Sequence, residues 1–265
     1  MEIPGATEGY FVMAFVVDKI SKRFAQLEVL LDISFCVDEN KIVCLLGPSG
    51  CGKTTLLNIF SGITAPDSGN LQGFTVENIS YLFQEPRLLE WRTVAENIDF
   101  VLKDKMTPEL RLQLIEKNLK LVGLWSYRNY FIPQLSGGMK QRVAVARAFS
   151  YPARIMLMDE PFKSLDLDLK ASLIQAFISL WQQDRRTVFF VTHDIQAAII
   201  LGDEIFVLSE KPTSLCNHIN NPVPIEERNL RHPAILAIEK ELYSHFSFFR
   251  QVCPEMSNFT LNRGA

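Results

Sequence analysis

One short stretch of the chain has the residue types and spacing of a phosphate-binding loop, G-x-x-x-x-G-K-[ST]. It reads Gly47-Pro48-Ser49-Gly50-Cys51-Gly52-Lys53-Thr54-Thr55. Glycines in such a loop let backbone N–H groups converge on phosphate oxygens, and the N-terminus of a following helix adds a positive dipole end. We expect Lys53 to place its charge on the outer phosphates and the Thr54 hydroxyl to be a ligand for Mg²⁺. The stretch therefore predicts a site for the phosphates of a nucleotide.

Two adjacent acids, Asp159 and Glu160, follow the strand-like run Arg154–Met158. Phosphoryl transfer needs one carboxylate near Mg²⁺ and one group that orients or deprotonates the attacking water. Successive residues at a strand end point in different directions, so Asp159 suits the first role and Glu160 the second. Alone, the pair would be an ordinary acidic turn; in a chain with a phosphate loop, it predicts hydrolysis of the bound nucleotide.

A Ser-Gly-Gly sequence, Ser136-Gly137-Gly138, opens a helical stretch. A hydroxyl and free N–H groups at a helix N-terminus form a small anion site. The same residues would also serve as a simple N-cap with a glycine turn. In a chain that already carries a phosphate loop and an acidic pair, they predict a second phosphate-recognition element.

The segments around these motifs alternate between strands and helices, which predicts a largely parallel sheet with helices packed on it. The polar turn Asp38-Glu39-Asn40 joins two strand-like runs, Ile33–Val37 and Lys41–Leu46, and we expect these two strands to pair antiparallel. Thr64–Asn70 is expected to be a turn. Further strands are expected at Met13–Ile20, Ile79–Phe83, Arg154–Met158, Thr187–Val191 and Glu204–Leu208. Helices are expected at Thr93–Leu102, Pro108–Val122, Gly137–Phe149, Leu167–Gln182, Asp194–Leu201 and Ala234–Phe246.

Composition narrows the functional class. The net charge is −3, with 27 basic and 30 acidic residues among 265, so a protein that coats nucleic acid is disfavoured. The cysteines Cys36, Cys44, Cys51, Cys216 and Cys253 have no C-x-x-C spacing, which favours a reducing compartment over disulfide or zinc sites. No apolar run approaches the ~18 residues of a membrane span, and Met1–Tyr10 lacks the basic segment of an export signal. We expect a soluble protein that acts on a membrane only through a partner.

Together, and in this order, the motifs resemble those of the ATP-binding cassette (ABC) ATPases over roughly Phe15 to Glu210. Gly47–Thr55 is similar to the Walker A motif, Ile155–Pro161 to the Walker B motif and Leu135–Arg142 to the signature motif. Ser164-Leu165-Asp166 resembles the D-loop, Val191-Thr192-His193-Asp194 the switch-histidine loop, and Gln84 has the place of the Q-loop glutamine. Met139 in the signature and Lys163-Ser164 before the D-loop aspartate depart from the commonest pattern of the family.

The resemblance implies an α/β fold, a P-loop NTPase of the ABC ATPase type, with a mostly parallel sheet core, an antiparallel β subdomain and an inserted helical subdomain. A single ABC ATPase domain would span residues 12–246. Its RecA-like core would comprise residues 12–84 and 153–210, and its helical subdomain residues 85–152. A C-terminal tail would occupy residues 211–265.

The resemblance also implies ATP and Mg²⁺ as cofactors. The loop Gly47–Thr55 would bind the phosphates of ATP, and Phe24 is the candidate for an aromatic ring stacked on the adenine. Thr54, Gln84 and Asp159 would lie at or near the metal.

Three residues would be catalytic by the same resemblance. Glu160 would act on the attacking water. His193 would contact the γ-phosphate and help to position the catalytic groups, and Gln84 would sense the γ-phosphate.

Each active site would be shared between two chains. In the family, Ser136 and Gly138 face the γ-phosphate bound by the Walker A loop of the other protomer, with Gly137 between them and Asp166 in the D-loop. The partner would be a second copy or a paired ABC subunit, related by a two-fold axis. ATP would favour the closed dimer and hydrolysis would release it.

The segment after Gln84 carries apolar Leu88, Leu89 and Trp91 among charged residues. Such a mixture favours a partner surface, although a helical lobe packed on its own core would also use these residues. The segment is similar to the Q-loop region of importer ATPases for nitrate, sulfonates and taurine. That resemblance implies a groove for a short helix of a transmembrane permease, an external solute-binding protein, and a peripheral place on the cytoplasmic face of the plasma membrane.

Other classes fit less well. DNA-repair ABC ATPases carry long coiled-coil insertions, and those acting in translation usually carry two cassettes; this chain shows neither. Exporters more often fuse the cassette to membrane spans. A P-loop kinase or GTPase would leave Leu135–Arg142 and His193 without a role. The sequence therefore favours the ATP-hydrolysing subunit of an importer, with a soluble non-transport ABC ATPase or an exporter ATPase as the alternatives.

Overall fold

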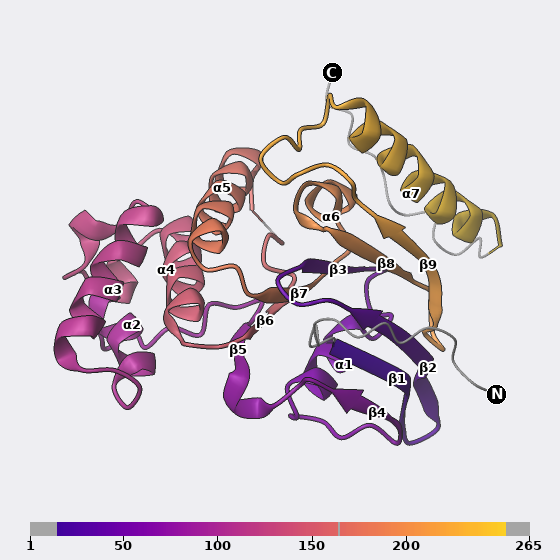
Figure 1. Cartoon of the computed structure of the whole chain (residues 1–265), viewed down its shortest axis with the longest axis horizontal. Helices are drawn as coiled ribbons and strands as arrows, with labels where there is room; N and C mark the ends of the chain where they lie inside the picture. Colours follow the sequence, from indigo (N-terminus) through magenta and orange to yellow (C-terminus); the bar gives the residue numbers. More distant parts are fainter. Residues whose placement is uncertain (1–14, 164, 253–265) are drawn as a thin grey trace, which may run out of the picture.

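Strand β3 (Ile42–Leu46) is buried along its whole length in the computed structural model, which describes residues 15–163 and 165–252. Cys44 and Leu46 pack into one hydrophobic core, and Val43 and Leu45 pack into a second core on the opposite face. A strand that is apolar on both faces has to be covered on both. Figure 1 shows the resulting layers around β3. Of the residues considered above, Met1–Tyr10, Met13, Ser164 and Cys253 lie outside the described residues.

The central sheet has six strands in the order β5-β6-β7-β3-β8-β9. Neighbouring strands from β5 to β8 are parallel, and only the edge strand β9 runs antiparallel to its neighbour. The strands that join β3 in this sheet are β5 (Ile79–Leu82), β6 (Ile155–Asp159), β7 (Thr187–Thr192), β8 (Glu204–Leu208) and β9 (Leu215–Asn220). The expected mostly parallel core is confirmed.

A second, antiparallel sheet consists of β1 (Phe15–Phe24), β2 (Leu27–Val37) and β4 (Ser68–Gln72) in the order β2-β1-β4. The expected pairing of Ile33–Val37 with Lys41–Leu46 is wrong. Strand β2 pairs with β1, and β3 lies between β7 and β8. The turn at Asn40, whose φ is 60°, sends the chain from one sheet into the other. Both hydrogen-bonding edges of β3 are taken by β7 and β8, so no edge is left for β2.

Two strands were not expected. Strand β4 begins inside the range Thr64–Asn70, which was expected to be a turn. Gly69 has φ +92°, and a Cβ there would lie 2.3 Å from the carbonyl oxygen of Lys19. The glycine therefore permits close approach of two strands rather than a turn. Strand β9 lies within residues 211–265, so the range expected to be a tail contributes a strand to the central sheet.

Helices cover both faces of the central sheet (Figure 1). Helix α1 (Lys53–Phe60) packs against β6 and β7 on the face that it shares with the antiparallel sheet. Helix α6 (Ile195–Leu201) packs against β3 and β7 on the other face, beside α5 (Leu167–Gln183). Helix α7 (Pro233–Val252) packs on α6. No helix among residues 15–163 and 165–252 combines the length and the hydropathy that crossing a bilayer requires.

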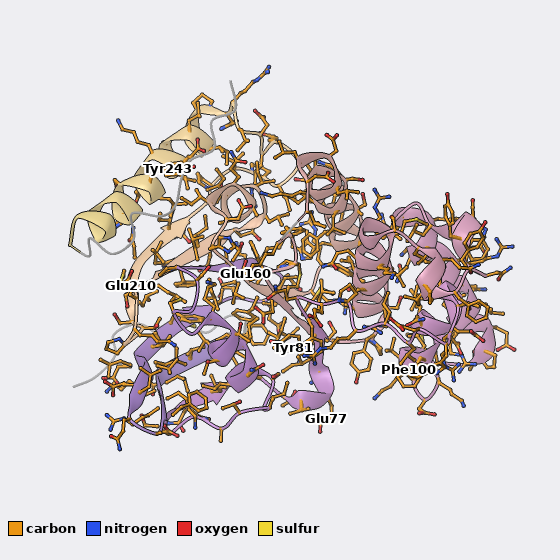
Figure 2. The ribbon with its side chains drawn as sticks, turned by 180° about the vertical axis from the view of Figure 1, so that it is seen from behind. Glu77, Tyr81, Phe100, Glu160, Glu210 and Tyr243 are labelled. Carbon is orange, nitrogen blue, oxygen red and sulfur yellow. The ribbon has the colours of Figure 1, made fainter. Side chains whose placement is uncertain are left out.

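The expected helical insertion lies between β5 and β6. It contains α2 (Val94–Leu102), α3 (Pro108–Leu121) and α4 (Gly137–Ser150), and it includes the short 3-10 helices η2 (Trp125–Tyr127) and η3 (Ile132–Gln134); a further one, η1 (Val76–Asn78), precedes β5. Helix α2 begins with a capping box, in which Thr93 and Glu96 each bond the backbone N–H of the other. Helix α4 packs against α5 and joins this lobe to the α/β body. Figure 2 shows Phe100 at the outer side of the lobe.

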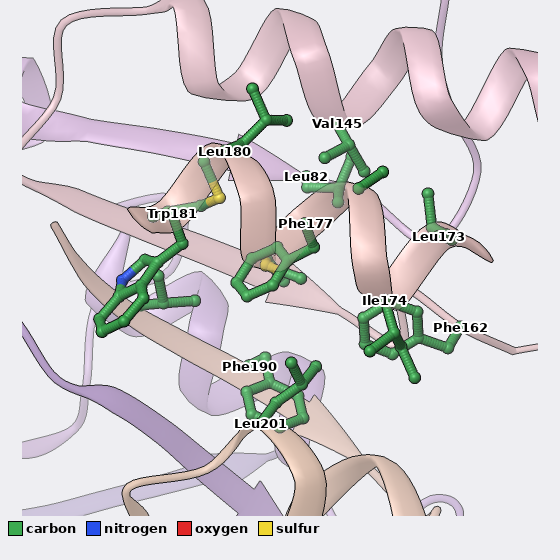
Figure 3. Close-up of a cluster of buried hydrophobic side chains, with 14 of the residues drawn as sticks. Leu82, Val145, Phe162, Leu173, Ile174, Phe177, Leu180, Trp181, Phe190 and Leu201 are labelled. Carbon is green, nitrogen blue, oxygen red and sulfur yellow. The ribbon is translucent and has the colours of Figure 1, made fainter. Parts of the chain in front are cut away.

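Helix α5 is held to the sheet by a cluster of large apolar side chains (Figure 3). Phe177 lies at its centre, fully buried, with its ring 5.5 Å from that of Phe149 on α4. Phe190 from β7 and Leu201 from α6 close the cluster from below. These contacts fix α4, α5 and the sheet relative to one another.

We expect Phe177→Ala to lower the free energy of unfolding by about 3–5 kcal/mol, because it leaves a cavity among close-packed side chains. Phe100→Ala is the matched control, since that side chain is 56% exposed; its cost should stay within about 0.5 kcal/mol. Guanidinium unfolding followed by tryptophan fluorescence measures both. Equal costs for the two variants would contradict the proposed role of the Phe177 cluster.

Candidate active site

The phosphate loop connects β3 to α1 and adopts a backbone that requires glycine at two positions. Gly50 has φ +79° and Gly52 has φ +116°, both in the left-handed region that glycine adopts readily. A Cβ at Gly52 would lie 2.8 Å from a methyl carbon of Val29, so β2 also closes on the loop. Lys53, the first residue of α1, is buried and donates hydrogen bonds of 2.9 Å to the carbonyl oxygens of Gly47 and Pro48. The loop thus encircles the lysine ammonium.

Asp159, the last residue of β6, lies beside the start of α1. The Thr54 hydroxyl donates a hydrogen bond of 3.1 Å to its carboxylate. Asp159 is only 7% exposed, and this burial raises the pKa of its carboxyl group. The negative charge of Glu160 also raises the pKa, whereas the hydrogen bond from Thr54 lowers it. A cation at this position would relieve the cost of keeping the carboxylate ionised.

The Thr54 and Asp159 oxygens fit the requirements of Mg²⁺. The ion prefers oxygen ligands at about 2.0–2.1 Å in octahedral geometry, in which adjacent ligands are roughly 3 Å apart. The two oxygens are 3.1 Å apart, at the mouth of the phosphate loop. The donor set and the spacing are therefore those of a magnesium site completed by phosphate and water oxygens.

Glu160 has an unusual backbone. Its φ is 46°, a conformation that costs free energy for a residue with a side chain, and its backbone N–H donates to the carbonyl oxygen of Val191 at 3.1 Å. The bond ties the end of β6 to the end of β7. The two acids have different partners: Asp159 accepts a bond from Thr54, and Glu160 lies near His193 and Lys53. Figure 2 labels Glu160 near the centre of the molecule.

Two cationic or protonatable groups meet the Glu160 carboxylate. The imidazole Nδ1 of His193 is 3.0 Å from both carboxylate oxygens, and the Lys53 ammonium is 3.5 Å from one of them. Burial alone would raise the pKa of Glu160, but His193 and Lys53 outweigh burial, and the pKa lies below its ordinary value. Glu160 is therefore an ionised carboxylate at neutral pH, held between groups from two other segments.

Gln84 and Phe24 lie at the margin of this cluster or outside it. Gln84 follows β5 by two residues and is exposed, and the pairing of Leu82 with Met158 places it at the sheet edge where Asp159 and Glu160 lie. Phe24 ends β1 at the tip of the hairpin with β2, where it is 48% exposed and lies under the Lys22 ammonium. An exposed ring at a strand end is available for stacking.

The signature residues lie on the surface of the helical lobe. Ser136 caps α4 by accepting the N–H of Met139 at 3.3 Å, and Ser136 and Gly137 are exposed. Gly138 is buried against Leu169 of α5, and a Cβ at this position would come within 2.7 Å of that side chain. Asp166 is an exposed N-cap of α5 that accepts the N–H of Leu169 at 2.9 Å. Ser136, Gly137 and Asp166 are thus exposed, whereas Lys53, Asp159 and Glu160 are buried.

The segment after Gln84 is held by two residues that the sequence motifs did not identify. Arg147 on α4 donates bonds of 3.0 and 2.9 Å to the carbonyl oxygens of Arg87 and Pro86. Asn97 on α2 is fully buried; it accepts the N–H of Leu89 at 2.8 Å and donates to the carbonyl oxygen of that residue at 3.1 Å. A polar residue on the otherwise apolar buried face of α2 was the available signal for Asn97.

The sequence predicts a partner surface that includes Leu88, Leu89 and Trp91, and these residues differ in their exposure. Leu88 is partly buried and packs against the main core. Trp91 is 73% exposed. The backbone N–H of Val94 bonds the carbonyl oxygen of Tyr130, and Thr93 forms a β-bridge with Phe131, so these two exposed aromatic residues lie next to the segment. We call Trp91, Tyr130 and Phe131 the aromatic surface.

The chain is similar to known proteins over most of its length. A family model described as ABC transporter matches residues 30–163. An uncharacterized ABC transporter ATP-binding protein of Methanocaldococcus jannaschii is 39% identical over 207 residues, which are 74% of this chain and 78% of that protein. The aliphatic sulfonates import ATP-binding protein SsuB of Bacillus cereus is 34% identical over 89% of this chain and 97% of its own. The taurine import ATP-binding protein TauB of Pelagibacter ubique is 37% identical over 74% and 77%.

The fold is also that of a solved structure. A dimeric ATP-binding cassette in a post-hydrolysis state, bound to ADP and Pi, matches with a TM-score of 0.68 and 27% identity, over 79% of this chain and 100% of that chain. The chain belongs to the ABC transporter family and has the fold of its ATP-binding subunits.

Proposed function

We propose that this chain is the ATP-hydrolysing subunit of an ABC importer for a small solute such as a sulfonate, taurine or nitrate. One observation carries the catalytic part of the proposal: the buried Glu160 carboxylate lies 3.0 Å from His193 and 3.5 Å from Lys53, beside the phosphate loop. An ionised, oriented carboxylate next to a phosphate site is what activation of an attacking water needs. The relatives with named solutes support the transport part.

In this proposal Lys53 and the N–H groups of the loop bind the β- and γ-phosphates of ATP. Thr54 and Asp159, with Gln84 just after β5, would hold Mg²⁺. When bound, the ion neutralises charge that develops on the phosphate oxygens. Phe24 supplies the stacking surface for the adenine.

Glu160 accepts a hydrogen bond from the attacking water and aligns it with the γ-phosphorus. Its lowered pKa keeps it in the accepting, ionised form. His193 fixes the carboxylate through Nδ1, which leaves Nε2 for the γ-phosphate. The left-handed backbone of Glu160 aims the side chain at the loop and is a cost that the surrounding contacts offset.

Exposure of Ser136 and Gly137 supports a site that is completed by a second chain, a copy or a paired ABC subunit. The exposed Asp166 would lie at the same interface. ATP then joins the loop of one chain to the signature of the other, and hydrolysis weakens that junction. We assign the loop and the acids to a core of residues 12–84 and 153–210 and the signature to a subdomain of residues 85–152, within a domain of residues 12–246. Residues 211–265 form the C-terminal part, whose strand β9 belongs to the central sheet.

The aromatic surface is the proposed contact with a transmembrane permease. It is apolar and exposed, and Trp91 comes shortly after Pro86 and Arg87, whose carbonyl oxygens accept bonds from Arg147 of the signature helix. Movement of α4 is therefore expected to displace it. A short amphipathic helix is a suitable occupant, since aromatic residues dominate such contacts. The chain would then be a peripheral protein on the cytoplasmic face of the plasma membrane, and the permease would receive solute from an external binding protein.

We expect Glu160→Gln to retain ATP binding and to lower turnover by at least about 100-fold, because the amide cannot take up the proton of the water. The variant should also accumulate as an ATP-bound dimer on size-exclusion chromatography. Phosphate release measures turnover, and a fluorescent ATP analogue measures binding. Turnover near that of the unsubstituted chain would refute the role of Glu160.

Trp91→Asp should leave the ATPase activity of the isolated chain within about twofold, because the residue lies on the surface and not in the site. In proteoliposomes with the permease that co-purifies with the chain, the same change should abolish most transport, since it puts a charge into an apolar contact. Tyr243→Asp on α7 is the control, an aromatic residue that is 48% exposed away from the aromatic surface. Transport that survives Trp91→Asp would exclude this surface as the permease contact.

A further inference from the structure

The turn that carries His193 is anchored from a helix that the catalytic cluster does not use. The ammonium of Lys170, in the first turn of α5, donates a hydrogen bond to Asp194 Oδ2 and forms an ion pair with it. Asp194 follows His193 directly. Its other oxygen, Oδ1, accepts the N–H of Ala197 at 3.1 Å and caps α6. One aspartate thus joins α5, α6 and the histidine turn.

The helix turn that carries Lys170 is fixed by hydrogen bonds and by packing. Asp166 caps α5 by accepting the N–H of Leu169, and the carbonyl oxygen of Asp166 accepts the N–H of Lys170 at 2.9 Å. Leu169 packs tightly on Gly138 of α4, where there is no room for a Cβ. The first turn of α5 is therefore held on one side by the signature helix and on the other by the histidine turn.

The ion pair is sheltered enough to hold its partners in place. The side chains of Lys170 and Asp194 are only 15% and 29% exposed, so solvent and salt screen the pair less than an open surface pair. The N–H of Asp194 also donates to the hydroxyl of Thr192 at 3.0 Å, which closes the turn around His193. Without the lysine, Asp194 would keep its bond to the N–H of Ala197 but would lose its tie to α5.

We propose that Lys170 is a positioning residue for His193: through Asp194 it fixes the turn that aims the imidazole at Glu160. The inference rests on the proposed function, because it assigns Lys170 to the support of the Glu160–His193 pair. In this proposal Lys170 acts through Asp194 and not directly on the nucleotide or the attacking water. It acts on the geometry of the site and leaves the phosphate loop unchanged.

The test uses the purified full chain and steady-state ATP hydrolysis. Lys170→Met removes the charge and keeps the length of the side chain, and Asp194→Asn removes the other charge while keeping an N-cap. Each should lower kcat by roughly tenfold and leave KM within about twofold, the signature of a mispositioned catalytic group. The double variant should be no worse than either single variant, because both remove the same interaction. Lys170→Arg should restore most of kcat.

Lys120→Met is the matched control, a lysine in a surface ion pair with Glu116 on α3. Its kcat should not change. A wild-type kcat in Lys170→Met, a drop in kcat that Lys170→Arg does not restore, or a double variant whose loss is the product of the single losses would each overturn the inference. If Lys170→Met does not fold, Lys170→Gln replaces it in the same cycle.

Glu160→Gln and His193→Ala in the same assay separate this inference from the proposed function. If both retain turnover, the proposed function fails. If both abolish turnover while the double-mutant cycle of Lys170→Met and Asp194→Asn shows no coupling, only the role of Lys170 fails.

Discussion

The structure depends on a buried charge, the carboxylate of Glu160, which is 9% exposed at the centre of the molecule. Removing this charge from water costs free energy. A buried carboxylate without partners takes up a proton and loses its function as an acceptor. Glu160 remains ionised because Lys53, from the start of α1, and His193, from the end of β7, lie beside it. Each group needs the other two: Glu160 gives Lys53 an anion in its buried site, and the histidine has a fixed acceptor for Nδ1.

This arrangement explains the order of the central sheet. Lys53 follows β3, Glu160 follows β6 and His193 follows β7, and these three strands are adjacent in the order β6-β7-β3. Because they are parallel, their carboxyl ends meet at one edge, where loops carry the chemistry. Parallel strands are apolar on both faces, so α1 with the antiparallel sheet has to cover one face and α5 with α6 the other. Placing three loops at one edge of a parallel sheet therefore requires two hydrophobic cores, one on each face.

The helical lobe packs on α5, one of the helices that cover the central sheet. Its signature helix α4 packs on α5, carries the exposed Ser136 and Gly137, and reaches the segment after Gln84 through Arg147. Asn97 of α2 holds the other end of that segment. The backbone of the segment is thus hydrogen-bonded to the lobe at both ends. A displacement of the lobe would carry the aromatic surface with it, and the first turn of α5 would transmit the same displacement to the turn of His193.

Features that depend on local spacing could be predicted from the sequence. The phosphate loop, the pair Asp159-Glu160, the helix start at Ser136 and the alternation of strands and helices all follow from residues close together in the chain, since a phosphate cradle or a helix cap needs only a few consecutive backbone groups. Features that rest on register between distant segments emerge only in the folded chain. The tertiary structure paired β2 with β1, showed that Gly69 serves a close strand approach, placed β9 in the sheet, and brought Lys53 and His193 to Glu160 and Lys170 to Asp194. Such contacts satisfy charges and cover apolar faces only when the whole chain is packed, and no local pattern encodes them.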